Sequence, residues 1–78
     1  MTAYRIGQDI RTNSPEFPMI HLTRIDPARH NGDRYGVMML SRDPESGKAC
    51  GWFFIASGDL KHCRERIRHY VSVYGLAD

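Results

Sequence analysis

The spacing of apolar residues changes along the chain, and the change separates strands from a helix. Residues 19–25 (MIHLTRI), 34–42 (RYGVMMLSR) and 48–57 (KACGWFFIAS) are strand-length segments rich in apolar and β-branched residues. The turn-forming sequences DPARHNGD and DPESG separate them, and such sequences favour hairpins between antiparallel strands. We therefore predict a three-stranded antiparallel β-meander over residues 19–57.

Beyond the last predicted strand the apolar residues repeat with helical spacing. One stripe follows the i, i+3, i+7, i+10, i+11, i+14 pattern and consists of Leu60, Cys63, Ile67, Tyr70, Val71 and Tyr74. Ser57 or Asp59 is suited to cap the start of this helix, and Gly75 is typical of a helix stop. The pattern predicts an amphipathic helix over residues 58–75, with Cys63 facing the core.

The first part of the chain has only scattered apolar residues. It ends in NSPEFP, whose two prolines favour an irregular or extended path, so residues 1–18 are predicted to be an arm or a short edge strand. A chain of 78 residues has material for one core. We therefore predict a single α+β domain over residues 1–78: a three-stranded antiparallel sheet with one C-terminal helix packed on one face.

The second and third predicted strands are apolar on both faces. Residues 37–40 read VMML and residues 52–55 read WFFI, whereas a strand covered on one side alternates apolar and polar residues. One helix covers only one face of a sheet. We expect the N-terminal arm to fold over the other face; the alternative is that this face contacts a second copy of the chain or another partner.

Composition predicts a folded protein, and the chain is expected to reside in the cytoplasm. The apolar fraction is 41% and the charged fraction 26%. No apolar run approaches the roughly 20 residues that span a bilayer, and the first residues lack the apolar segment of a signal peptide. In a reducing compartment Cys50 and Cys63 are expected to be free thiols. We expect no membrane partner.

The cations are mostly arginine, and several lie in one short segment. The net charge is +2, and arginine makes planar, bidentate contacts with phosphate and carboxylate. The segment HCRERIRHY, residues 62–70, combines arginines with two histidines. His62 and His69 are two helical turns apart, roughly 10 Å along the axis, which is too far for one metal ion. We therefore expect no metal site.

A helical wheel divides the basic residues of the helix into two groups beside the apolar stripe. Lys61, Arg64 and Arg68 border one side, and His62, Arg66 and His69 lie on the other. One interpretation is structural, since long basic side chains often cover apolar surface with their methylene groups. The other is a contact with phosphates or carboxylates of a partner. The candidate partner-binding residues are Lys61, Arg64, Arg66 and Arg68 on the helix, with Arg29, Arg34 and Arg42 in and beside the loops.

The sequence contains no recognisable catalytic motif. It has no nucleophile elbow, no glycine-rich phosphate loop and no carboxylate pair in a known framework. We therefore expect a protein that is not an enzyme, with no catalytic residue and no cofactor.

Two resemblances bear on function. LTRIDPAR, residues 22–29, followed by RYGVMML and a late helix, resembles the opening of bacterial WGR domains, which are nucleic-acid-binding modules. The Trp-Gly-Arg motif that names that family is absent, so the resemblance assigns no functional residue. In size and build the chain is similar to phage-encoded anti-CRISPR proteins, which share no diagnostic motif. That resemblance implies a protein that binds a CRISPR surveillance complex or nuclease, and one that acts in the host cytoplasm if it is phage-encoded.

Together these features predict a non-enzymatic binding protein that inhibits or modulates a nucleoprotein complex through an arginine-rich surface. The expected case is an anti-CRISPR-type protein that blocks DNA recognition by occlusion. The alternatives are a direct nucleic-acid-binding module and a dimerising accessory protein that uses the second apolar face of the sheet. The expected partner is a protein or nucleoprotein complex, with nucleic acid as the alternative, and the chain is expected to be a monomer or a homodimer.

Overall fold

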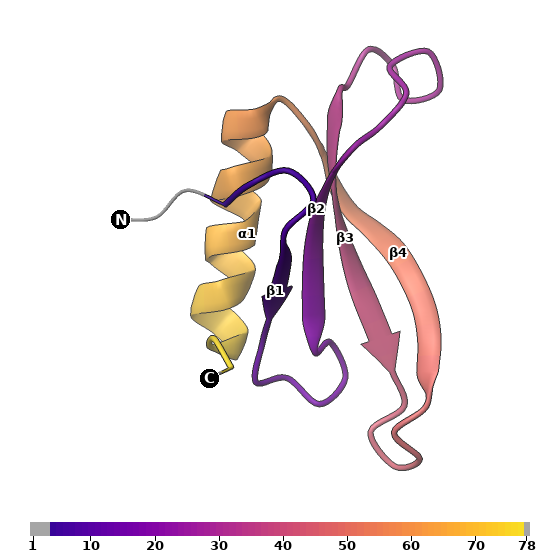
Figure 1. The fold of residues 1–78 in the computed structure, drawn as a ribbon, viewed down its shortest axis with the longest axis vertical. Helices are drawn as coiled ribbons and strands as arrows, with labels where there is room; N and C mark the ends of the chain where they lie inside the picture. The colour runs from indigo at the N-terminus through magenta and orange to yellow at the C-terminus, as the bar shows by residue number, and fades with distance from the viewer. Residues whose placement is uncertain (1–3, 78) are drawn as a thin grey trace.

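A computed structural model describes residues 4–77. The chain forms β1 (Asp9–Arg11), β2 (Met19–Arg24), β3 (Tyr35–Arg42), β4 (Ala49–Gly58) and α1 (Leu60–Tyr74), in that order. The strands make one antiparallel sheet in the order β1-β2-β3-β4, and α1 lies along one face of it (Figure 1). The predicted α+β class, the antiparallel sheet and the single C-terminal helix are confirmed.

The prediction of three strands is wrong, because the N-terminal segment adds a fourth. Of the two alternatives predicted for residues 1–18, the short edge strand is the one that forms. Ile10 pairs with Ile20 of β2 and is 4% exposed, while its neighbours Asp9 and Arg11 are exposed. A strand of three residues with one apolar side chain is too short to show an alternating pattern in the sequence. β1 is stabilised by its hydrogen bonds with β2 and by the burial of Ile10 in the common core.

The expectation that the N-terminal arm covers the second face of the sheet is also wrong. β1 extends the sheet sideways by pairing with the edge of β2. The segment after it turns toward the helix side, where the Phe17 ring lies 5.9 Å from the rings of both Phe53 and Tyr74. In the described part of the chain, residues 4–77, the arm therefore does not cover the face opposite α1.

Local capping sets the ends of α1, which is shorter than the predicted helix over residues 58–75. Asp59 is the N-cap, and its Oδ1 accepts a hydrogen bond from the His62 N–H at 2.7 Å. Ser57, the other predicted cap, instead donates to Asp33 at 2.8 Å. Gly75 ends the helix with φ 81°, and its N–H donates to the Val71 carbonyl at 2.8 Å. The predicted glycine stop is confirmed.

The core lies between α1 and one face of the sheet. Its buried members are Ile10, Ile20, Leu22, Val37 and Met39 from the strands and Cys63 and Ile67 from the helix. Cys63 and Ile67 are fully buried, which confirms the orientation predicted from the helical stripe. Burial raises the pKa of the Cys63 thiol above its ordinary value, and the negative charges of Asp59 and Asp33 raise it further. Cys63 and the exposed Cys50 are both free.

The helix of the described residues is neither long enough nor apolar enough to cross a membrane.

β3 and β4 pair over their whole lengths, with register shifts at Val37/Met38 and at Ser41/Arg42. These shifts place one extra residue in β4 at each point, and such bulges increase the local twist of the sheet.

Candidate contact surface

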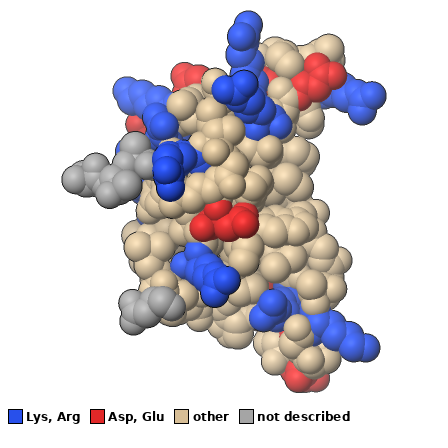
Figure 2. Space-filling view, viewed as in Figure 1, with Lys and Arg blue, Asp and Glu red and all other residues tan. Residues whose placement is uncertain are grey.

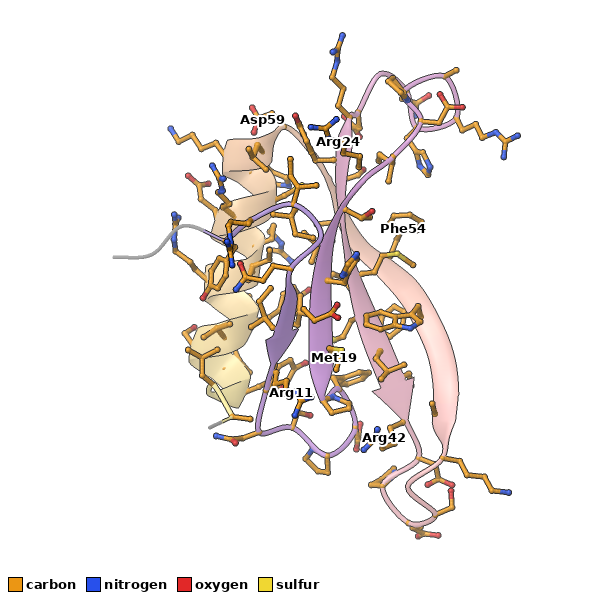
Figure 3. The ribbon with its side chains drawn as sticks, viewed as in Figure 1. Arg11, Met19, Arg24, Arg42, Phe54 and Asp59 are labelled. Atoms are coloured by element: carbon orange, nitrogen blue, oxygen red, sulfur yellow. The ribbon has the colours of Figure 1, made fainter. Side chains whose placement is uncertain are left out.

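The face of the sheet opposite α1 carries a continuous group of apolar and aromatic side chains. The cross-strand register places Met19 beside Leu40 and Trp52, and places His21 beside Met38 and Phe54. Their neighbours along the strands point into the core. We call this group the open-face patch; it consists of Met19, His21, Met38, Leu40, Trp52 and Phe54. Figure 3 shows Phe54 on the side of the sheet away from α1.

Two aromatic side chains of the open-face patch are exposed although they are large. Trp52 is 43% exposed and Phe54 is 48% exposed. Their rings contact histidines on one side: His21 lies 6.0 Å from Trp52, and His30 lies 5.3 Å from Phe54, between ring centroids. These neighbours restrict both rings while leaving much of their surface to solvent.

A shallow hollow of about 300 Å³ lies on the open-face patch. Asp9, His21, Met38 and Trp52 line it. The Nδ1 atom of His21 lies 2.6 Å from Oδ1 of Asp9, and the imidazole N–H donates to the carboxylate. The hollow therefore combines one apolar side with one polar side, which suits the insertion of a partner side chain or base.

Gly36 lies in β3 beneath the ring of Phe54. A Cβ at this position would lie 2.8 Å from Cε1 of Phe54 and 3.2 Å from Cγ2 of Ile25. The missing side chain thus allows the Phe54 ring to lie close against the backbone of β3. The glycine in this strand helps to position one of the two exposed aromatic rings.

Basic side chains gather at the two ends of the sheet. Arg24, Arg29 and Arg34 lie at the β2–β3 end, and Arg11, Arg42 and Lys48 lie at the opposite end, as the register of the strands requires. Figure 2 shows blue side chains toward both ends, and an acidic group near the middle with blue side chains above and below it. The open-face patch therefore lies between two basic ends.

Most of these cations have no acidic partner in the part of the chain that the structure describes. Within residues 4–77 there are two ion pairs, His21 with Asp9 and Arg29 with Asp26 at 3.8 Å. Arg24 and Arg34 line a surface hollow of about 260 Å³ together with Tyr35. Two guanidinium groups without carboxylate partners suit the binding of phosphate or carboxylate from another molecule.

The basic side chains of α1 lie on the other side of the sheet, and two of them contact the protein itself. Arg64 Nε donates to the Tyr4 carbonyl at 2.9 Å. The Arg66 guanidinium donates to the Tyr70 hydroxyl at 3.0 Å and lies 5.2 Å from the centre of that ring. Lys61 and Arg68 are exposed. The structural interpretation therefore accounts for two of the four residues: Arg64 holds the N-terminal segment against the helix, and Arg66 packs on the surface of the helix itself.

The structure thus divides the predicted partner-binding residues into two surfaces. Arg29, Arg34 and Arg42 lie at the ends of the sheet, near the open-face patch, while the four basic residues of α1 belong to a helix on the opposite face of the sheet. His62 and His69 are both exposed on the helix. Within residues 4–77, no three His, Cys, Asp or Glu side chains are grouped so that they can hold one metal ion.

The aromatic residues at the centre of the surface were not among the predicted site residues. The signal was present in the consecutive apolar residues of 37–40 and 52–55, which implied two apolar faces. Because side chains alternate along a strand, Trp52 and Phe54 share a face. What the sequence did not reveal is that this face is the one that α1 leaves uncovered, with Phe53 turned to the helix side. Comparisons with protein-family models, with curated proteins and with solved structures find no match to this chain.

Proposed function

We propose that this chain is a non-enzymatic binding protein that inhibits or modulates a nucleoprotein complex, with the open-face patch as its contact surface. The observation that carries the proposal is the exposure of Trp52 and Phe54, at 43% and 48%, on a sheet face between two basic ends. Tryptophan and arginine are over-represented among the residues that dominate binding energy at interfaces. Large exposed aromatic groups of this kind are typical of interaction surfaces.

The chemistry of the surface favours a partner that offers apolar protein surface and negative charge together. The aromatic centre gains most by covering apolar protein, whereas the unpaired guanidinium groups of Arg24, Arg34 and Arg42 gain most beside phosphate or carboxylate. A protein bound to RNA or DNA presents both within a small area. The anti-CRISPR-type case, a CRISPR surveillance complex whose DNA recognition is blocked, is the specific form of the proposal that size and build favour.

In this mechanism the chain acts by stoichiometric occlusion. The arginines orient it over the nucleic-acid-binding region of the partner, and the open-face patch provides the apolar contact that slows dissociation. No covalent step is involved. Direct binding to free nucleic acid is the alternative, since exposed aromatic rings also stack on unpaired bases.

The test uses the full chain and a purified CRISPR surveillance complex with its guide RNA. We expect a stable complex by size-exclusion chromatography, and we expect Trp52→Ala and Phe54→Ala each to weaken binding about 30-fold or more. Val73→Ala is the matched control, because Val73 is 60% exposed on α1. It should leave the affinity unchanged. Equal affinities for wild type and the two aromatic variants, or no binding to the complex, would refute the proposal.

Charge reversal identifies the basic residues that take part. Arg34→Glu and Arg42→Glu should weaken binding about tenfold or more and reduce its salt dependence. Arg68→Glu on the opposite side should change it less than about threefold. A larger effect from Arg68→Glu than from the other two would move the contact to the helix. Binding of free RNA or DNA as tightly as the complex, with a steep salt dependence, would replace the proposal with direct nucleic-acid binding.

A further inference from the structure

The two edges of the sheet differ in how they are protected. The outer edge of β1 is paired with the end of the chain: the Ala77 N–H donates to the Arg11 carbonyl at 3.0 Å, and the Asn13 N–H donates to the Gly75 carbonyl at 3.0 Å. Thr12 and Leu76 form a bridge between these contacts. β4 is the other edge strand, and within residues 4–77 no element pairs with its outer side.

The alternation of backbone hydrogen bonds along the strands shows which N–H and C=O groups of β4 point away from β3. The Leu22 N–H donates to the Gln8 carbonyl on the β1 side of β2. Backbone N–H and C=O groups point to alternate sides along a strand, so those of His21 point toward β3. His21 pairs with Met38, so the backbone groups of Met38 point toward β2. Those of the next residue, Met39, therefore point toward β4, and those of its partner Phe53 point back toward β3. The backbone N–H and C=O groups of Trp52 and Phe54 therefore point away from the sheet.

The side chains of β4 lack the usual devices that keep an edge strand from pairing. Its ten residues, ACGWFFIASG, contain no charge and no proline. Phe53 is 41% exposed on the helix side, while Trp52 and Phe54 are 43% and 48% exposed on the other side. A partner on the open face alone would cover Trp52 and Phe54 but leave Phe53 exposed. A strand that pairs with the edge would cover side chains on both faces.

The bulges of β4 limit the segment that is available. The register shifts place Cys50 and Ile55 as the extra residues, and bulges end regular pairing because they twist the strand. Gly51 has a positive φ of 126°, so the regular part between the bulges is residues 52–54, which are aromatic on both faces. This short segment is the part of the edge that another strand can extend.

We propose that β4 pairs with β4 of a second copy of the chain, antiparallel about a two-fold axis at Phe53. In this register each Trp52 faces Phe54 of the other copy in a hydrogen-bonded pair, so all four outward-pointing backbone groups find partners. The two Phe53 side chains meet on the helix side. The second copy is the favoured occupant because an uncharged segment with aromatic residues placed symmetrically about its centre is complementary to itself, and a two-fold contact closes.

The available area corresponds to a weak dimer, which forms at high protein concentration. Each aromatic side chain offers about 150–250 Å² in total. At the exposed fractions of 41%, 43% and 48%, the three rings of two copies expose roughly 400–650 Å² in total. Pairing at the edge covers part of this area, which is below the ~1,000 Å² expected of a stable biological interface. The resulting sheet of eight strands would join two open-face patches, but the inference does not depend on the proposed function.

The first test measures mass by light scattering and sedimentation from micromolar to near-millimolar concentration. Wild type should change from monomer to dimer. Phe53→Lys and Phe53→Glu should each weaken self-association at least about 100-fold, since like charges then meet at the axis. An equimolar mixture of the two variants should recover dimers, as heterodimers. Val73→Lys, a control on α1, should behave as wild type.

These variants leave Trp52 and Phe54 in place, so a failure of dimerisation is distinguishable from a failure of nucleoprotein binding. A second measurement needs no variant. Amide hydrogen exchange should show that Trp52 and Phe54 become protected only as the concentration rises, whereas Phe53 is protected throughout by its pairing with Met39. A wild-type chain that is monomeric at every concentration would overturn the inference. Freely exchanging Trp52 and Phe54 amides in a dimer, or a variant mixture that stays monomeric, would also overturn it.

Discussion

Replacement of Ile67 by alanine tests whether the helical stripe is the main anchor of α1 on the sheet. Ile67 is fully buried among the strand residues of the core. The substitution removes three carbon groups, each contributing about 0.8 kcal/mol when buried, and it leaves a cavity. Losses of about 2–5 kcal/mol are usual for such changes. We expect the free energy of unfolding to fall by about 3 kcal/mol, because alanine recovers only a few tenths through its higher helix propensity.

That loss is large for a chain of 78 residues. The total free energy of unfolding of such a domain is about 4–12 kcal/mol, and 1 kcal/mol shifts the midpoint temperature by about 4–8 °C. Ile67→Ala should therefore lower the midpoint by about 12–24 °C. The assay is thermal and urea unfolding followed by far-ultraviolet circular dichroism, with native-like signal at low temperature as the check on folding.

Val73→Ala is the matched control on the same helix, since Val73 is 60% exposed. It should change the free energy of unfolding by less than about 0.5 kcal/mol. If Ile67→Ala costs under about 1 kcal/mol, or no more than Val73→Ala, the helix does not pack on the sheet through this stripe and the reasoning from its periodicity is refuted.

Three further predictions concern hydrogen bonds and protonation. Thr12→Val should lower the free energy of unfolding by about 1–3 kcal/mol in urea titrations, because the 5% exposed Thr12 donates to the Phe17 carbonyl and accepts from the Ser14 N–H; a neutral substitution would contradict this. Asp59→Ala should cost about 1 kcal/mol while Asp59→Asn costs clearly less, and equal losses would argue against a capping role. Because the folded pKa of Cys63 is raised above 9.0, its contribution to stability is present at lower pH and is lost as pH rises through the folded pKa. Stability should thus fall more steeply above about pH 9 in wild type than in Cys63→Ala, and parallel pH profiles would refute this.

Features that depend on residues close together in the sequence could be predicted before the structure was known. The cap at Asp59 and the stop at Gly75 are set by hydrogen bonds within four positions. The β3–β4 hairpin is similarly local, since Asp43 in its loop accepts hydrogen bonds from Glu45 and Ser46. Such contacts need no information from the rest of the chain.

The candidate site was predicted only in part. The sequence pointed to arginines on the helix, but Arg64 donates to the carbonyl of Tyr4, 60 positions away, and this contact cannot be read from local spacing. The sequence also indicated a second apolar face, but the expected cover from the arm was wrong. The arm carries Ile10, which gains more by burial beside Ile20 in the core than an arm lying across the open face offers.

The sequence by itself determined the strand and helix periods, the turns and the direction in which Cys63 and Ile67 point, because these follow from backbone geometry over a few residues. Tertiary structure alone decided that the N-terminal segment forms an edge strand rather than an arm, that β4 is a free edge within residues 4–77, and that the face shared by Trp52 and Phe54 is the uncovered one. Those outcomes depend on which distant segments bury each other's apolar surface. That choice is made by packing of the whole chain around one core.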